Sequence, residues 1–178
     1  MGERVNVEIK AIARNLGEIR KSVRALGPAY VGTFRQVDTY LKVAKGRLKL
    51  REWVDGEGGE LVYYDRENVP RPKRSRVTIA AVSEPRGVKE ILERGLGVMV
   101  VVEKVREIYR YKGTQIHLDT VKGLGTFVEL EREVEDDVHA LQEGEKELNR
   151  LMKRLGIADK DLLIGSYSDL LQPEPPSR

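Results

Sequence analysis

The sequence predicts an α+β fold in which an antiparallel sheet closes into a barrel with helices packed outside it. Eight segments are predicted to be strands, several of them by a clear alternation of apolar and polar residues, whereas only three segments have the spacing of an amphipathic helix. Many of the strand segments place charged side chains on one face and aliphatic side chains on the other. The three apolar helix faces need an aliphatic surface to cover, and closing the sheet removes its exposed edges.

The first strand, VNVEIKA (5–11), places valine and isoleucine on one face and Asn6, Glu8 and Lys10 on the other. A helix follows at 15–27, where Asn15 and Glu18 resemble a capping box and Gly27 ends the helix. A second helix is expected at 83–97 with Val88, Ile91 and Leu92 facing inward, and a third at about 137–155. The other seven strands are expected near 33–43, 47–54, 60–65, 76–82, 98–112, 114–121 and 127–134.

Composition limits the class of protein. The 178 residues fit one domain, taken as 1–171, followed by a Pro-rich tail (172–178) that is predicted to be disordered. The absence of cysteine excludes disulfides, thiol nucleophiles and cysteine-based zinc sites. No apolar run is long enough to span a membrane and no signal-peptide pattern is seen, so we expect a cytoplasmic protein without a membrane partner.

Charges of the two signs are segregated among the strands, although the formal net charge is only +3. Basic residues share a face in GRLKLRE (46–52) and in 100–109, while Glu129 and Glu131 share a face in the last strand, and His117 lies on the same face as Asp119. If helices cover the aliphatic faces, the charges point into a lumen. A bound polyanion would balance the charge of the basic wall of this lumen, and divalent cations, Mg²⁺ or Mn²⁺, would balance the charge of its acidic wall. The plainer alternative is an open sheet with a solvated face, which periodicity alone favours.

The chain resembles the CYTH family, the triphosphate tunnel metalloenzymes, over about residues 5–171. The resemblance is carried by segments in the order of that family: VNVEIKA, QVDTYL (36–41), GRLKLRE, YYDR (63–66), KRSR (73–76), EKVREIY (103–109), HLDTVKGLGTFVELE (117–131) and SYSDLL (166–171). It implies a closed eight-stranded antiparallel β-barrel whose lumen binds triphosphate. One residue departs from the family signature Glu-x-Glu-x-Lys, because Asn6 replaces the first glutamate and would weaken metal binding there.

The resemblance also implies roles for individual residues. The residues expected to grip phosphate oxygens at the catalytic centre are Lys10, Lys49, Arg51, Lys104 and Arg106. The expected outer substrate contacts are Arg47, Arg66, Arg74 and Arg76. The expected metal ligands are Glu8, Glu129, Glu131 and Asp119. His117 is interpreted as structural rather than as a general base, and His139 as exposed.

Two reactions and one non-catalytic role remain open at this level. The family includes class IV adenylate cyclases and thiamine triphosphatases, so the substrate could be ATP, thiamine triphosphate or inorganic triphosphate. The same lining could serve hydrolysis or ATP cyclisation. The alternative is a polyanion- or RNA-binding module, which the clustered carboxylates argue against, so nucleic acid is not the expected partner. The sequence leaves the oligomeric state open, with a homodimer among the options.

Overall fold

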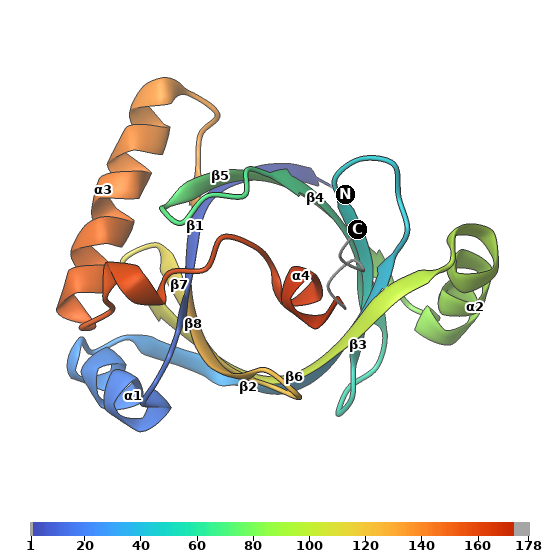
Figure 1. Cartoon of the computed structure of the whole chain (residues 1–178), viewed down its shortest axis with the longest axis horizontal. Helices are drawn as coiled ribbons and strands as arrows, with labels where there is room; N and C mark the ends of the chain where they lie inside the picture. The colour runs from blue at the N-terminus through green and yellow to red at the C-terminus, as the bar shows by residue number, and fades with distance from the viewer. Residues whose placement is uncertain (1, 173–178) are drawn as a thin grey trace, which may run out of the picture.

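Eight antiparallel strands form a closed barrel in the computed structural model, which describes residues 2–172 (Figure 1). Around the barrel the order is β1-β5-β4-β3-β2-β6-β7-β8, so β1 joins the two ends of the sheet by pairing with β5 and β8. The strands are β1 (Gly2–Ile12), β2 (Ala29–Leu41), β3 (Arg47–Trp53), β4 (Gly59–Arg66), β5 (Lys73–Val82), β6 (Val98–Tyr111), β7 (Thr114–Val121) and β8 (Gly125–Val134). The predicted fold class is confirmed, and β2 begins four residues before the predicted start.

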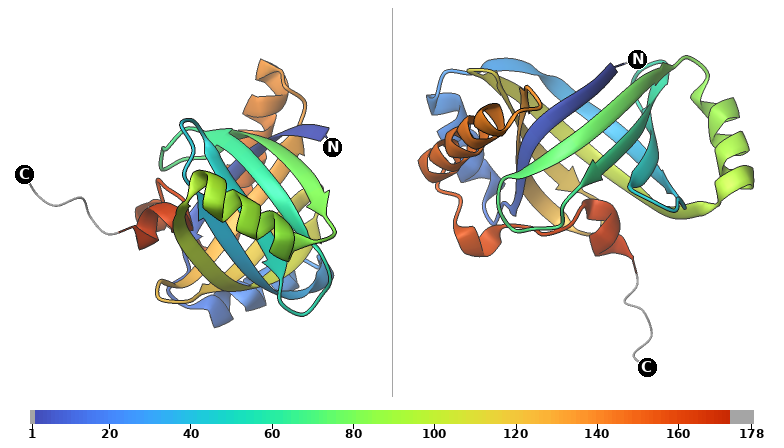
Figure 2. Two further views of the ribbon diagram at one scale, coloured as in Figure 1. Left: turned by 90° about the vertical axis from the view of Figure 1, so that its right-hand side faces the viewer. Right: turned by 90° about the horizontal axis from the view of Figure 1, so that it is seen from above.

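Three longer helices lie outside the barrel, as predicted. Helix α1 (Leu16–Ala25) and helix α3 (Val138–Arg154) lie beside the wall formed by β1, β7 and β8, and α2 (Pro85–Leu96) lies at the opposite side of the molecule (Figures 1 and 2). The side chain of Asn15 accepts a hydrogen bond from the backbone N–H of Glu18 and caps α1. Asp137 caps α3 through the backbone N–H groups of His139 and Ala140.

The main apolar core lies between the outer face of this wall and the two helices. Val7 and Ile9 of β1 and Leu130 of β8 face outward and pack with Leu148 and Leu151 of α3. Because successive strand residues point to opposite faces, burying these aliphatic side chains outside directs the charged residues between them into the lumen. The aliphatic strand faces therefore determine which side chains reach the site.

Helix α2 does not bury its apolar stripe as predicted. Ile91 is 70% exposed, and the helix contains no buried residue. The reason is its position: α2 packs mainly against β2 and β3 and lies at the end of the barrel, on the side away from α1 and α3 (Figures 1 and 2). Ile91 therefore faces away from the sheet, while Val88 and Leu92 are half-buried.

The segment after α3 contains two short helices that the sequence analysis did not predict. They are a 3₁₀ turn at Asp159–Asp161 and α4 at Tyr167–Leu171. Helices of three and five residues are too short for an apolar periodicity to reveal them. Helix α4 lies at one opening of the barrel, within the ring of strands in Figure 1 and beside the barrel end in Figure 2. Residues 173–178 of the predicted disordered tail lie outside the described residues.

Within residues 2–172, no helix has the length and apolar character required to cross a membrane.

Candidate functional site

The barrel lumen contains a charged cavity of about 660 Å³, a volume that includes the space at its open mouth. Its walls carry six cationic and four acidic side chains. The cationic ones are Lys10, Lys49, Arg51, Arg66, Lys104 and Arg106, and the acidic ones are Glu8, Asp38, Glu129 and Glu131. All seven residues that the strand alternation directs to a common lumen therefore meet in one cavity: Lys10, Lys49, Arg51, Lys104, Arg106, Glu129 and Glu131.

Three cations surround Asp38 on the basic wall. Lys49 donates to its Oδ2 at 2.9 Å, Arg51 donates to both carboxylate oxygens at 2.8 and 3.0 Å, and Lys104 donates to Oδ2. Burial alone would raise the pKa of Asp38, but Arg51, Lys104 and Lys49 hold it well below its usual range. One carboxylate thus orients three cations whose combined charge it cannot neutralise.

The same cluster lowers the pKa of two of its lysines. Burial and the neighbouring Arg51 bring the pKa of Lys49 to about 8, although Asp38 acts against this shift. Burial lowers the pKa of Lys104 well below its ordinary value, and Asp38 again opposes the change. These lysines lack enough negative charge around them, which is the condition in which a bound anion is favourable.

On the opposite wall, Glu129 lies among cations. Its Oε2 is 3.1 Å from the Nζ of Lys10 and accepts a hydrogen bond from Arg106 at 2.6 Å. Burial opposes ionisation of Glu129, but Lys10 and Arg106 keep its pKa well below the ordinary value. Arg106 is in turn held by Asp119, which accepts from its Nε at 2.7 Å and its Nη2 at 2.6 Å.

Asp119 does not line the cavity. It is fully buried, and its Oδ2 also accepts a hydrogen bond from the hydroxyl of Tyr167 at 2.7 Å. Burial favours its neutral form, yet Arg106 lowers the pKa of Asp119 to about 2. With both oxygens engaged, Asp119 is placed to orient Arg106 rather than to hold a metal, in contrast to the role that the resemblance implies.

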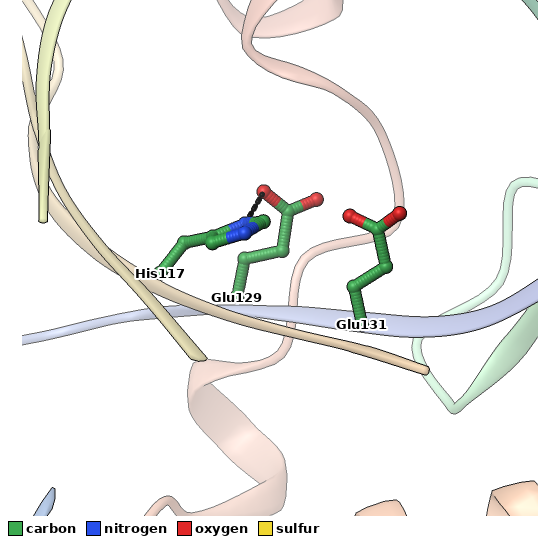
Figure 3. A group of neighbouring side chains, drawn as sticks. All are labelled: His117, Glu129 and Glu131. Carbon is green, nitrogen blue, oxygen red and sulfur yellow. Dashed lines mark hydrogen bonds and ion pairs between the residues drawn. The ribbon is translucent and has the colours of Figure 1, made fainter. Parts of the chain in front are cut away.

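A group of three potential ligands lies on β7 and β8: His117, Glu129 and Glu131 can each offer an atom within 4.8 Å of the others (Figure 3). Glu131 accepts a hydrogen bond from the side-chain amide of Asn6, and Glu8 is paired with Arg66 instead of joining the group. Two carboxylates and one imidazole are a suitable donor set for a divalent cation. The residues present therefore fit the metal that the resemblance implies.

The four arginines expected as outer contacts occupy different places. Arg66 lines the cavity, and Arg47 lies at the α4 end, where it donates to Asp169 at 2.8 Å. Arg74 and Arg76 lie on the opposite face of β5 from the cavity-lining Ser75, and both pair with Asp136 near the start of α3. The structure thus places Arg66 in the cavity wall and Arg47 at the α4 end of the barrel, and leaves Arg74 and Arg76 outside.

Several lumen residues were not among the predicted site residues. Asp38 and Tyr40 belong to QVDTYL, where the alternation that selects Lys49 or Lys104 would also have selected them. Tyr167 lies on α4, and no strand periodicity could indicate that it reaches Asp119. Its ring packs against Phe127 at 4.9 Å between centroids, and the Nζ of Lys10 lies 3.9 Å from its centre.

The model of the CYTH domain family matches residues 4–167. The chain belongs to the CYTH domain family. This assignment agrees with the closed barrel and with the order of the charged strand segments described above.

Relatives of this CYTH protein extend over nearly its whole length. A protein from Methanocaldococcus jannaschii named "Putative adenylate cyclase" is 25% identical over 175 residues, covering 93% of this chain and 98% of that protein. The structure of the PH1012 protein from Pyrococcus horikoshii has a TM-score of 0.84 at 24% identity, with 94% and 99% of the two chains covered.

A more distant structure carries a described activity. It is the structure of the "Putative adenylyl cyclase HpAC1" from Hippeastrum, a protein with a dominant triphosphatase activity. Its TM-score is 0.61 at 15% identity, with 92% of this chain and 91% of that chain covered. At this identity the likeness extends to the fold alone.

Proposed function

We propose that this CYTH protein binds a triphosphate in its barrel lumen and hydrolyses it with the help of a divalent cation. The observation that carries the proposal is the enclosure of six cations and four carboxylates in a single cavity. The lining has an excess of two positive charges, while a triphosphate carries up to about four negative ones. One divalent cation would supply the difference.

The basic wall is suited to hold the phosphates. Arg51 can present its guanidinium to two phosphate oxygens, and Lys49 and Lys104 act as point charges beside it. Asp38 keeps all three in fixed positions, so little reorganisation is needed as charge develops on the bridging and leaving oxygens.

The acidic wall provides the cation site. Glu129 and Glu131 would hold the ion, and Lys10 and Arg106, both bound to Glu129, would contact phosphate oxygens next to it. When bound, a divalent cation neutralises phosphate charge and assists attack at phosphorus. In the hydrolytic reaction water attacks the terminal phosphorus, the bond to its bridging oxygen breaks, and phosphate leaves with the diphosphate product.

Cyclisation of ATP is the other reaction of interest, because the relative from M. jannaschii is named for it. It requires the ribose 3′-hydroxyl to attack the α-phosphorus in line with departing pyrophosphate. Water reaches an open cavity more readily than a ribose hydroxyl can be aligned, and the activity described for the Hippeastrum protein is a dominant triphosphatase. The easier access of water is the reason to favour hydrolysis, since the Hippeastrum protein shares only the fold.

Product analysis tests the proposal. The protein is incubated with ATP, thiamine triphosphate and inorganic triphosphate, each with Mg²⁺ or Mn²⁺. We expect phosphate together with a diphosphate, or with pyrophosphate from inorganic triphosphate. Formation of cyclic AMP and pyrophosphate from ATP would show that the protein cyclises ATP instead of hydrolysing it. Absence of any product, together with RNA binding that weakens steeply with salt, would favour a polyanion-binding module instead.

A further inference from the structure

We propose that the cation bound by Glu129 and Glu131 takes a third protein ligand from the Nδ1 atom of His117, and that the site therefore prefers Mn²⁺ to Mg²⁺. The inference deepens the proposed function, on which it rests for the use of a divalent cation. It adds a nitrogen donor and a metal preference to a site otherwise made of oxygen.

The three side chains converge from neighbouring strands. His117 on β7 is the pairing partner of Glu129 on β8, and Glu131 lies two residues further on the same face. Figure 3 shows the imidazole beside one oxygen of Glu129, while the other carboxylate oxygen points towards Glu131. The Nδ1 atom lies 3.4 Å from Oε2 of Glu129, and His117 is 3% exposed. The imidazole therefore faces the carboxylates inside the lumen rather than solvent.

Gln115 determines which ring nitrogen faces the carboxylates as an acceptor. Its side-chain oxygen, which can only accept, lies 3.2 Å from Nε2 of His117. An N–H on Nε2 can donate to this oxygen, and in that tautomer Nδ1 presents its lone pair to the lumen carboxylates, as a metal ligand must. A cation bound to Nδ1 would take the place of the contact between Nδ1 and Oε2 of Glu129, which lie 3.4 Å apart. A metal-binding histidine usually donates its other ring N–H to an oxygen acceptor, and the side-chain oxygen of Gln115 is placed to be that acceptor.

Glu131 supplies an independent reason to place a cation here. The other four carboxylates on the lumen face of the strands, Glu8, Asp38, Asp119 and Glu129, each form an ion pair with Lys or Arg. Among the described residues, Glu131 forms none within 4.0 Å and accepts only from the neutral amide of Asn6. Its charge is thus oriented but not neutralised, next to a second carboxylate and an imidazole.

The ligand chemistry leads to the metal preference. Mg²⁺ requires near-ideal oxygen coordination and gives up its waters reluctantly, whereas Mn²⁺, which also suits carboxylates, is a transition-metal ion that accepts an imidazole nitrogen more readily than Mg²⁺ does. Two carboxylates and one imidazole should therefore favour Mn²⁺ over Mg²⁺ relative to the same site without the nitrogen.

The sequence makes a direct spectroscopic test available, because the chain has only two histidines, His117 and His139. The full chain, without a polyhistidine tag and in imidazole-free buffer, is loaded with Mn²⁺ and studied by pulsed electron paramagnetic resonance. We expect a coupling from a directly bound nitrogen that changes when histidine is labelled with ¹⁵N. The coupling should persist in His139→Gln, a control on the exposed face of α3, and disappear in His117→Gln.

Binding measurements complete the test. His117→Gln should weaken Mn²⁺ binding by roughly 10-fold or more and change Mg²⁺ binding much less. Gln115→Leu should weaken Mn²⁺ binding by roughly 10-fold, and Gln115→Glu, which keeps an acceptor on Nε2, should restore it. If Gln115→Leu and Gln115→Glu weaken Mn²⁺ binding equally, the role of Gln115 is only structural.

The proposal is overturned if bound Mn²⁺ has no nitrogen coupling in the unmodified protein, if the coupling survives His117→Gln, or if the preference for Mn²⁺ is unchanged in that variant. If His117→Gln fails to fold, the coupling is measured in His139→Gln with ¹⁵N-labelled histidine. His117 is the only histidine in that variant, so a change in the coupling on labelling must come from His117. Triphosphate turnover is measured separately. If the protein turns over triphosphate but bound Mn²⁺ has no nitrogen coupling, His117 is not a ligand and the proposed hydrolysis stands. If the coupling is present but no triphosphate is turned over, the proposed hydrolysis is wrong and His117 remains a metal ligand.

Discussion

Glu129 and Glu131 lie two residues apart on β8, yet their surroundings differ. Glu129 is bound by Lys10 and Arg106, so its charge contributes to the fold as well as to the site. Glu131 is half-buried and accepts a hydrogen bond only from the amide of Asn6 among the described residues. The two residues should therefore respond differently to the same substitution.

Glu131→Gln should leave stability near that of the unmodified protein, because it removes no ion pair, and should lower metal-dependent turnover by at least about 100-fold. Glu129→Gln should lower both, at a cost of about 3 kcal/mol or more, because buried Lys10 loses its carboxylate partner and Arg106 keeps only Asp119. Urea unfolding and turnover over a Mg²⁺ titration measure these effects. Full activity of Glu131→Gln throughout the titration would contradict its role as a ligand.

Asn6 allows a gain-of-binding experiment. Asn6→Glu restores the residue of the family signature and places a third carboxylate beside Glu131. Without metal the variant should be less stable, because like charges are brought together, and it should reach half-maximal activity at a lower Mg²⁺ or Mn²⁺ concentration. Asn6→Gln, which adds length but no charge, is the control. An unchanged or higher metal requirement in Asn6→Glu would show that Asn6 does not limit metal binding.

At the scale of elements, β2 positions the basic wall for its neighbours on both sides. Asp38 on β2 pairs with Lys49 and Arg51 on β3 and with Lys104 on β6. Its side chain is almost completely buried. The three strands therefore share one carboxylate as the common partner of their cations.

Asp38→Asn should destabilise the protein by about 3 to 5 kcal/mol, because it leaves three buried cations without their counter-charge. Inorganic triphosphate should recover more stability in this variant than in the unmodified protein, since the anion replaces the lost charge. Urea unfolding with and without the anion measures both effects. Asp55→Asn, which breaks the exposed pair with Arg35, serves as control and should cost less than about 1 kcal/mol. A similarly small cost for Asp38→Asn would contradict this role of β2.

For the whole molecule, the excess of lumen cations predicts an unusual dependence of stability on pH. Burial lowers the pKa of Lys49 and of Lys73 from 10.5 to about 8, so between about pH 8 and 10 the unfolded chain holds protons that the folded chain has lost. Stability without anions should therefore rise with pH in this range. Above about pH 10 burial of Tyr64, with a pKa of about 12, acts in the opposite direction, because the unfolded tyrosine ionises first.

Bound triphosphate should keep Lys49 charged, so binding at pH 8 to 9 should take up protons and affinity should fall as pH rises through this range. Calorimetric titration in buffers of different ionisation enthalpy measures the uptake, and urea unfolding at a series of pH values measures the stability. Lys49→Met should reduce the proton uptake. Equal uptake in Lys49→Met would assign the titration to another group.

The sequence by itself determined which side chains face the lumen. Alternation is a local property with a period of two, so Lys10, Lys49, Arg51, Glu129 and Glu131 could be assigned to one face without knowledge of the strand order. The departure at Asn6 and the family could likewise be recognised from the order of short motifs. The outer placement of Arg74 could not be predicted in this way, because the expected strand began at residue 76, whereas β5 begins at Lys73.

The tertiary structure alone decided which charges meet. Lys10 lies opposite Glu129 because β1 closes the barrel against β8, a pairing between strands far apart in the chain. The same closure leaves Glu131 beside Asn6, and the return of the chain after α3 brings the Tyr167 hydroxyl to Asp119. Such contacts depend on strand order and register around a closed sheet, which no local pattern encodes. Local periodicity therefore fixes the composition of the lumen, and closure of the barrel fixes its pairing.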